Sequence, residues 1–434
     1  MKIAFVNPNF TNRRSRDAMQ PLAFAILKAL TPPEVETVLF DERVEEIDFS
    51  VECDAVGISV QSFTARRGYE VARRFRERGI PTIIGGHHAT LLPDEASEHS
   101  DAVVVGSAEH TWPQVVDDLI RGTLARRYEA VEGEIPDVVP DRSLFAGKRY
   151  SRVTPVQFAR GCRYSCDFCS VNAFYRGKAY QRSVESVLTD IDGISSRYLL
   201  FVDDNIYGNS DDTVELFRSL RARNRKWACQ ISIDSASDDN LLALMADAGC
   251  IAVFVGLESL NPANLRQIRK VSNLRYGDYE EAIRRFAEHG IMFCGSFLFG
   301  YDSDTLDTIK AAYEFAVRNR LVIAHFNTLY PMPATALYSR LESEGRLRYD
   351  RWWVDPEFRY GQAMFHPRSI SAQDLGTACY EMRRNFNSLG NITRRFTDRR
   401  TNSRNWENAL AYLAANFISR KEIRLKQTMK LGAG

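Results

Sequence analysis

The sequence predicts an α/β protein: an N-terminal doubly wound parallel sheet, then a partial barrel of six βα units, then a small helical region. Over the first ~130 residues, and again from about residue 150, short apolar runs alternate with segments whose apolar residues recur at helical spacing. Such alternation is typical of parallel sheets that helices cover on both faces. After Pro331-Met332-Pro333 the chain becomes helical and basic.

The first part of the chain, residues 1–135, is expected to form one doubly wound domain. A helix is expected around Gly68–Arg78, where Tyr69, Val71 and Phe75 share one face. In such a sheet, ligands bind beyond the carboxyl ends of the strands. The five predicted strands are Lys2–Val6, Glu36–Phe40, Ala55–Val60, Pro81–Gly85 and Ala102–Val105.

A stretch from about Arg126 to Tyr150 lacks periodicity and is expected to be a linker. We expect the barrel to span residues 150–335 and a helical, basic domain to span 336–434. As in a complete barrel, the chemistry should lie at the carboxyl ends of the strands. The six predicted barrel strands are Pro155–Arg160, Tyr198–Asp203, Ala228–Ile233, Ile251–Gly256, Met292–Phe299 and Val322–Leu329.

Charge and composition exclude several classes of protein. The formal net charge is +1 over 434 residues, which argues against binding nucleic acid over the whole surface. Residues 383–434 carry twelve Lys or Arg against three Asp or Glu, a local balance of +9. This tail is either a solvated helical surface or a patch for an anionic substrate, a redox partner or a peripheral membrane contact.

The sequence shows neither a membrane span nor an export signal. No apolar run approaches the roughly 20 residues that cross a bilayer, and MKIAFVNPNF reads as a first strand. We therefore expect a cytoplasmic protein with reduced thiols, in which clustered cysteines indicate a metal. Five of the eight cysteines are scattered in apolar surroundings, and three are clustered.

The clustered cysteines are Cys162, Cys166 and Cys169, spaced C-x3-C-x2-C directly after a predicted strand. Thiolates bind iron and zinc well, and one short loop can wrap a single cluster. Three ligands would leave one iron of a [4Fe–4S] cubane open to another ligand. The alternatives are a zinc site with a distant fourth ligand and a chance grouping of buried cysteines.

With Phe168 before its last cysteine, this loop resembles the signature of the radical SAM superfamily. The resemblance implies that the open iron chelates S-adenosylmethionine and that reductive cleavage yields a 5′-deoxyadenosyl radical. It implies that Asp203 or Asp204 faces the methionyl amino group, although an N-cap by Asp204 or Asn205 is the structural alternative. The other residues implied to bind cofactor in the barrel are Gln230 and Ser232 for the ribose and methionine ends, Glu258 for the ribose hydroxyls (or as a structural residue) and Gly295 for the adenine.

The N-terminal part, with Gly85-Gly86-His87-His88-Ala89-Thr90 after its fourth strand, resembles the cobalamin-binding radical SAM enzymes. Glycines at these positions would let the corrin or its nucleotide tail approach the backbone. No Asp-x-His-x-x-Gly motif is present, so a histidine lower ligand is not expected. Both histidines are expected to be solvated or hydrogen-bonded, and a domain that has lost cobalamin is the alternative. The residues implied to bind cobalamin are Gln61, Ser62 and Phe63 at the lower corrin face, with Gly85, Gly86 and Glu109.

The leading hypothesis is a cobalamin-dependent radical SAM C-methyltransferase that acts on an unactivated carbon of a small molecule, natural-product precursor or lipid precursor. A flavodoxin or ferredoxin would supply electrons. His325, Asn327 and Tyr330, at the end of the sixth barrel strand, are the expected substrate-facing residues. One alternative is a radical SAM cyclase, oxidase or rearrangement enzyme, with or without use of cobalamin; another is a non-catalytic iron–sulfur electron carrier.

Overall fold

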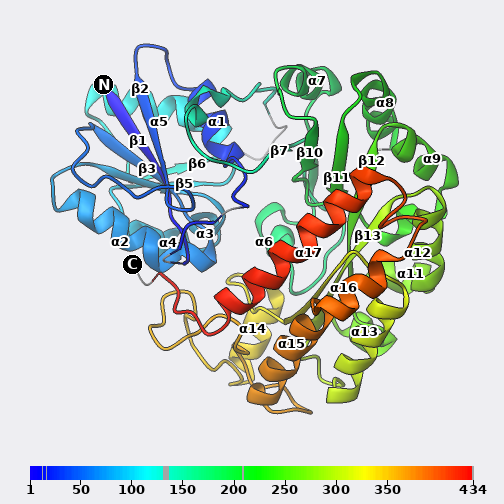
Figure 1. Ribbon diagram of the computed structural model, residues 1–434. Helices are drawn as coiled ribbons and strands as arrows, with labels where there is room; N and C mark the ends of the chain where they lie inside the picture. The colour runs from blue at the N-terminus through cyan, green and yellow to red at the C-terminus, as the bar shows by residue number, and fades with distance from the viewer. Residues whose placement is uncertain (12, 16, 131–135, 208–209, 433–434) are drawn as a thin grey trace.

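The computed structural model describes residues 1–434 apart from 12, 16, 131–135, 208–209 and 433–434. Two six-stranded parallel sheets dominate the fold and lie side by side, the N-terminal sheet in blue to cyan and the barrel sheet in teal, green and yellow (Figure 1). Both follow the predicted α/β class. The α-helices are α1 Leu22–Ala29, α2 Ala65–Arg76, α3 His87–Leu91, α4 Pro93–His99, α5 Trp112–Arg121, α6 Ser170–Tyr175, α7 Val184–Asp192, α8 Ser210–Leu220, α9 Asp239–Asp247, α10 Pro262–Gln267, α11 Val271–Tyr276, α12 Tyr279–Glu288, α13 Leu306–Arg318, α14 Ala336–Ser343, α15 Ala372–Phe386, α16 Leu389–Phe396 and α17 Trp406–Lys426.

The N-terminal sheet has the strand order β2-β1-β3-β4-β5-β6. Helices α1 and α5 cover one face, where Phe24 and Val115 are buried, and α2 and α4 cover the other, where Val71 and Ala96 are buried. Burial on both faces explains why β1 and β3 read as continuous apolar runs. The strands are β1 Lys2–Asn7, β2 Glu36–Asp41, β3 Ala55–Ser59, β4 Thr82–Gly85, β5 Ala102–Val105 and β6 Arg127–Glu129.

Strand β6 corrects the expectation that residues 126–150 form only a linker. It adds a sixth, three-residue strand beside β5, and Tyr128 on it is buried. A strand this short carries one buried side chain and so leaves no periodicity to detect. Residues 131–135 of the expected linker lie outside the described residues.

The barrel sheet has the order β14-β13-β12-β11-β10-β7, as six successive βα units predict. One prediction here was wrong, because the first strand does not run to Arg160. Strand β7 ends at Val156, and Ala159–Gly161 forms β8, which pairs antiparallel with β9 (Ala179–Gln181). The other strands of the sheet are β10 Tyr198–Phe201, β11 Lys226–Gln230, β12 Cys250–Glu258, β13 Met292–Phe299 and β14 Ile323–Thr328.

The C-terminal region is less helical than expected, because residues 344–371 contain no α-helix. This segment instead places Trp352, Trp353 and Phe358 in the core of the N-terminal part. Helix α17 then crosses the front of the barrel, in red in Figure 1, and its Tyr412 packs with Cys294 of β13. The C-terminal region therefore packs against both sheets. Among the described residues, no helix has both the length and the apolar character required to cross a membrane.

Candidate active site

The three clustered cysteines lie on one loop that begins at the end of β8. Gly161 opens the loop with φ of +79°, and a Cβ there would lie 2.1 Å from the Lys178 carbonyl oxygen, so only glycine fits. Cys166 is buried, and Cys162 and Cys169 are half-buried. Burial raises the pKa of the Cys166 thiol to about 11, although the Lys270 ammonium acts in the opposite direction. A metal must therefore displace the proton from a desolvated thiol.

The cysteine loop fits a polynuclear cluster. No three His, Cys, Asp or Glu side chains in the described ranges converge on a point where one metal ion could sit. A cubane does not require such convergence, because each of its irons takes its own thiolate. Burial raises the pKa of Cys169 as well, with a net upward shift, although the Lys270 ammonium and the backbone N–H groups of Asn172 and Val171 act in the opposite direction.

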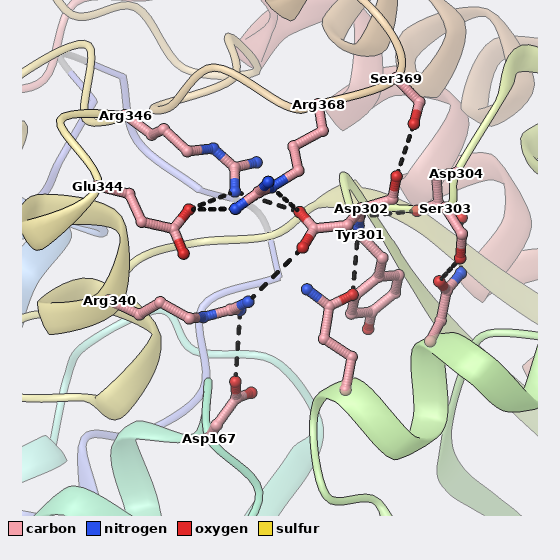
Figure 2. Close-up of polar contacts among 12 residues, drawn as sticks. Asp167, Tyr301, Asp302, Ser303, Asp304, Arg340, Glu344, Arg346, Arg368 and Ser369 are labelled. Carbon is pink, nitrogen blue, oxygen red and sulfur yellow. Dashed lines mark hydrogen bonds and ion pairs between the residues drawn. The ribbon is translucent and has the colours of Figure 1, made fainter.

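Asp167, inside the cysteine loop, anchors that loop to the C-terminal part of the barrel. Its backbone N–H donates to the Ile268 carbonyl (3.2 Å), and its carbonyl accepts from the N–H of Leu337 (3.0 Å). Its carboxylate lies 3.5 Å from the Arg340 guanidinium of α14 (Figure 2). Burial raises the pKa of Asp167 and Arg340 lowers it, with a net upward shift. The backbone of the motif is thus fixed from two sides.

Behind Arg340, an ion-pair network extends to Asp302, which follows strand β13 (Figure 2). Asp302 meets Arg346 at 3.1 Å and Arg368 at 3.4 Å, and both of these arginines also contact Glu344. The members of the network come from the irregular segment after α14 and from the loop after β13. Arg340 connects this network to the cysteine loop through Asp167.

Lys270 brings a positive charge to the cysteine loop. Its Nζ lies 3.1 Å from Glu258 Oε1, and both side chains are largely buried. Burial lowers the pKa of Lys270, but Glu258 and Cys166 raise it well above its usual value, so the ammonium stays charged. A Cβ on Gly256 would lie 2.2 Å from the Glu258 carboxylate, so glycine leaves room for the pair. Glu258 itself has φ of +62° at a bulge in β12. Its carboxylate is therefore committed to Lys270.

The two aspartates after β10 take different positions. Asp203 is buried, and its Oδ1 accepts the N–H groups of Phe158 and Ala159, which turns the chain out of β7. Burial raises the pKa of Asp203 to about 7. Asp204 is half-buried, and its Oδ2 accepts the Gly161 N–H at 2.8 Å at the entrance to the cysteine loop. Both carboxylates therefore hold backbone, and Asp204 is the one nearer the cysteines.

The remaining predicted cofactor residues of the barrel divide into two groups. Gln230 and Ser232 lie beside the cysteine loop: Gln230 donates to the Asp204 carbonyl (2.8 Å), and Asn205 joins Ser232 to the Cys162 thiol. Phe168 packs against the barrel core. Gly295 faces the opposite side, since its absent Cβ would meet Leu257 and Leu321 of that core at 3.2 and 3.0 Å.

A cavity of about 450 Å³ opens at the carboxyl edge of the N-terminal sheet. Its inner part runs between the sheet and helices α1 and α5, where Phe24, Val104 and Trp112 form apolar walls. Its outer part is lined by residues of the barrel side that lie near the cysteine loop: Gln157, Arg160, Phe174, Tyr175 and Val202. Both sheets therefore contribute to one cavity.

Glycines shape the N-terminal wall of this cavity. Gly86 has φ of +96°, and a Cβ there would lie 2.9 Å from the Ser59 hydroxyl and the Val60 carbonyl. Gly57 lies against Phe5, where a Cβ would be at 3.1 Å, and Gly85 lies against Val104. The neighbours occupy the space of each absent Cβ, so close packing requires glycine at these positions, and the three glycines present their backbone to the cavity.

The predicted cobalamin-binding residues are only partly brought together. Gln61, Gly85, Gly86 and Glu109 line the cavity. Ser62 does not: it is buried, and its hydroxyl pairs with His88 Nδ1 at 3.0 Å, while His88 Nε2 lies 3.2 Å from Glu95. Phe63 contacts Tyr330 and Trp352 instead. His87 lines the cavity and stacks on Phe174, and burial lowers its pKa to about 4.

Glu109 and Arg160 form a buried ion pair between the two halves of the cavity. Glu109 follows β5, and Arg160 lies on β8, two residues before Cys162. Burial raises the pKa of Glu109, but the Arg160 guanidinium lowers it, with a net downward shift. Arg160 also donates to Gln157 Oε1 at 2.6 Å. The pair links the cavity to the cysteine loop.

The predicted substrate-facing residues lie at the end of β14. His325 is exposed on the inner face of the barrel, and Asn327 is half-buried on the same face. The protein that encloses this open interior desolvates the imidazole, and this effect and the nearby Arg383 lower the pKa of His325, so its imidazole is neutral at pH 7. Tyr330 packs edge-on against Phe63 at 5.6 Å. Tyr330 therefore contacts the N-terminal half of the chain, whereas His325 and Asn327 face the barrel interior.

Sequence reasoning missed four basic residues of the site: Lys270, Arg340, Arg160 and Arg383. Each reaches the site from a distant element or from outside the cysteine motif. Arg160 alone had a local signal, since it directly precedes Gly161 and the first cysteine. The partners of the others are 12 to 173 residues away, which no short motif reveals.

Comparison with known proteins agrees with this geometry. Residues 156–316 match the model of the radical SAM superfamily. The chain is 29% identical to bacteriochlorophyllide d C-12(1)-methyltransferase of Chlorobaculum tepidum over 82% of this chain and 80% of that protein. It is 28% identical to bacteriochlorophyllide d C-8(2)-methyltransferase of the same organism over 76% of this chain and 78% of that protein. It superposes on the cobalamin-dependent S-adenosylmethionine radical enzyme OxsB with a TM-score of 0.70, at 15% identity over 98% of this chain and 72% of that one.

The three-cysteine loop on a six-stranded partial barrel defines a radical SAM enzyme, whose cofactors are a [4Fe–4S] cluster and S-adenosylmethionine. This class excludes the electron-carrier alternative. The doubly wound domain in front of the barrel specifies the group further. Residues 156–316 form a radical SAM domain, and the whole fold resembles that of a cobalamin-dependent radical SAM enzyme.

Proposed function

We propose that this enzyme is a cobalamin-dependent C-methyltransferase that acts on an unactivated carbon of a small molecule, a natural-product precursor or a lipid precursor. The observation that carries the proposal is the cavity of about 450 Å³ whose walls come both from the N-terminal strand ends and from residues beside the cysteine loop. A methyl donor held there would lie next to the site where the radical arises. The two bacteriochlorophyllide methyltransferases support the same outcome.

The cavity fits cobalamin by chemistry and shape. The slot between the sheet and α1 has apolar walls at Phe24 and Trp112, as a planar nucleotide base requires. Gly85 and Gly86 would hold the corrin edge near the backbone, and Gln61 would face its lower side. When bound, the cluster supplies the electron that cleaves S-adenosylmethionine, and cobalamin supplies a carrier for the methyl group.

The chain's own residues position these groups. Cys162, Cys166 and Cys169 would hold three irons and leave the fourth for S-adenosylmethionine. The Lys270 ammonium, paired with Glu258, offsets the negative charge of the thiolates. Asp204 accepts the Gly161 N–H and would help to hold the loop around the cluster. Asp204 would also be the acidic residue closest to the methionyl ammonium.

A cyclase, oxidase or rearrangement enzyme of the same family is the alternative outcome. The two outcomes differ in co-products, because methylation consumes two molecules of S-adenosylmethionine in different ways. We would incubate the anoxic, cobalamin-loaded enzyme with reductant, S-adenosylmethionine and bacteriochlorophyllide d as the first substrate to try. S-adenosylhomocysteine with 5′-deoxyadenosine is expected for methylation, and 5′-deoxyadenosine alone would favour the alternative. The Cys166→Ala variant, which lacks one iron ligand, should form no 5′-deoxyadenosine.

Three further features are part of the proposal: division into domains 1–135, 150–335 and 336–434, a cytoplasmic location, and a flavodoxin or ferredoxin as electron donor.

A peripheral membrane contact through α17 is favoured by four exposed apolar side chains on that basic helix. Flotation with vesicles of phosphatidylcholine and phosphatidylglycerol should retain the wild type but not a variant in which these four side chains are polar; equal flotation would argue against the contact. The four are Trp406, Leu410, Phe417 and Ile418.

A further inference from the structure

Arg383 of α15 is a buried cation without an anionic partner in the described part of the chain. The residue is 8% exposed, and the described partners of its guanidinium are two neutral amide side chains. Its Nη1 and Nη2 donate to the amide oxygens of Asn327 and Gln427, both at the long distance of 3.3 Å. Its Nε is buried and has no acceptor. Burying a guanidinium with so few hydrogen bonds costs folding free energy unless a further acceptor or anion binds to it.

The other buried arginines make better contacts. Arg67 and Arg160 each pair with a glutamate. Arg395 donates to three backbone carbonyls at 2.8 Å and to Asn416 at 2.9 Å. Arg182 donates to two carbonyls and a hydroxyl. Arg182 and Arg395 also leave Nε without an acceptor, but their other donors make three and four hydrogen bonds of 2.6–3.1 Å, whereas those of Arg383 make two, both at 3.3 Å.

The location of Arg383 indicates a ligand. Asn327, its partner, lies at the carboxyl end of β14, where a βα barrel carries its chemistry. His325, exposed on the same inner face, is neutral and adds no second cation. An aromatic wall lies beside them, in which Phe63 contacts Tyr330 at 5.6 Å and Tyr360 at 6.1 Å. The surroundings thus offer one positive charge and one apolar surface.

We propose that Arg383 binds a carboxylate of the substrate, whose apolar part packs against the aromatic wall of Phe63, Tyr330 and Tyr360. The occupant is the substrate only if the proposed function holds. A guanidinium matches a carboxylate through two parallel N–H donors, and Nη1 and Nη2 of Arg383, each with a second N–H besides the one directed at Asn327 or Gln427, provide them. A single cation suits a single negative charge better than the double charge of a phosphate monoester. Arg383 would therefore select a carboxylate-bearing, largely apolar substrate and set its orientation in the barrel.

The test measures binding of fluorescent probes to the cofactor-loaded chain by equilibrium titration. The probes are 2-naphthoate, the uncharged 2-naphthamide and 2-naphthyl phosphate. Naphthoate should bind wild type roughly tenfold to hundredfold more tightly than naphthamide, because a hydrogen-bonded charge contributes on that scale. Arg383→Gln should weaken naphthoate by a similar factor and leave naphthamide unchanged. Arg383→Lys keeps the positive charge but lacks the two parallel N–H donors. Its affinity for naphthoate should therefore lie between those of wild type and Arg383→Gln.

The control is Arg384→Gln, one residue along the same helix, where the side chain is exposed and the charge change is identical. This variant should bind naphthoate as wild type does. Equal binding of naphthoate and naphthamide, or unchanged binding in Arg383→Gln, would overturn the proposal. Tighter binding of naphthyl phosphate than naphthoate would also overturn it. If methylation fails while naphthoate binding still depends on Arg383, the proposed function is at fault and the carboxylate site is not.

Discussion

Substituting Glu109 by Gln would test whether the ion pair between the two sheets holds the cavity together. Glu109 and Arg160 are each 8% exposed, and removing one partner of a buried pair costs about 3–5 kcal/mol. The remaining neutral partner of Arg160 is Gln157 at 2.6 Å, and the new amide oxygen can still accept one bond. We therefore expect a loss near the lower limit, about 3 kcal/mol in the free energy of unfolding.

A double-mutant cycle separates this pair from general damage. Glu109→Gln with Arg160→Gln should recover most of the loss, since no buried charge is then left unpaired. The control is Glu281→Gln in the exposed Arg284–Glu281 pair, which should cost less than about 1 kcal/mol. Urea unfolding followed by tryptophan fluorescence measures all of these variants. A Glu109→Gln loss below about 1 kcal/mol, or a double variant as unstable as the sum of both single ones, would refute the reasoning.

Three other variants test separate parts of the account. Cys166→Ala should lower the iron content of the anoxic protein to near zero, whereas Cys250→Ala should keep it; iron in both would contradict the cluster assignment. Burial raises the pKa of Asp203 to about 7, so its contribution to stability is present below pH ~4 and is lost as pH rises toward 7. Asp203→Asn should remove this loss of stability with rising pH. If the melting temperatures of variant and wild type change by the same amount between pH 5 and pH 8, the raised pKa of Asp203 is contradicted. Gly86→Ala should cost on the order of 1–3 kcal/mol and abolish corrin binding, because φ is +96° and Ser59 is 2.9 Å away. Gly390→Ala, in open space within α16, should lower neither the melting temperature nor the corrin content.

The class of fold could be predicted from the sequence because burial on both faces of a sheet leaves a continuous apolar run. Strand β13 was predicted with its bounds, Met292–Phe299, and β5 with Ala102–Val105. Strand β6 could not be predicted, because three residues with one buried side chain give no pattern. The end of β7 was also missed, since the carboxylate of Asp203 from a neighbouring strand takes the N–H groups that would have continued it.

The candidate site, like the fold, could be predicted from the sequence only in part. The three cysteines follow from local spacing, because one loop must present all the thiolates to one cluster. The residues that brace and charge this loop come from elements far along the chain. Arg340 reaches Asp167 across 173 residues, and Arg383 reaches Asn327 across 56. Only the fold brings these pairs together. The cofactor roles assigned to individual barrel residues, such as Gln230 and Glu258, stay predictions.

The central claim is that the cavity between the two sheets holds cobalamin beside a three-cysteine cluster. It is tested most directly by purifying the chain without oxygen, with cobalamin supplied, and by measuring iron, sulfide and corrin per chain. The account predicts about four irons and one tightly held corrin. About four irons without corrin would contradict it, because the radical chemistry would then remain while the proposed methyl carrier was absent.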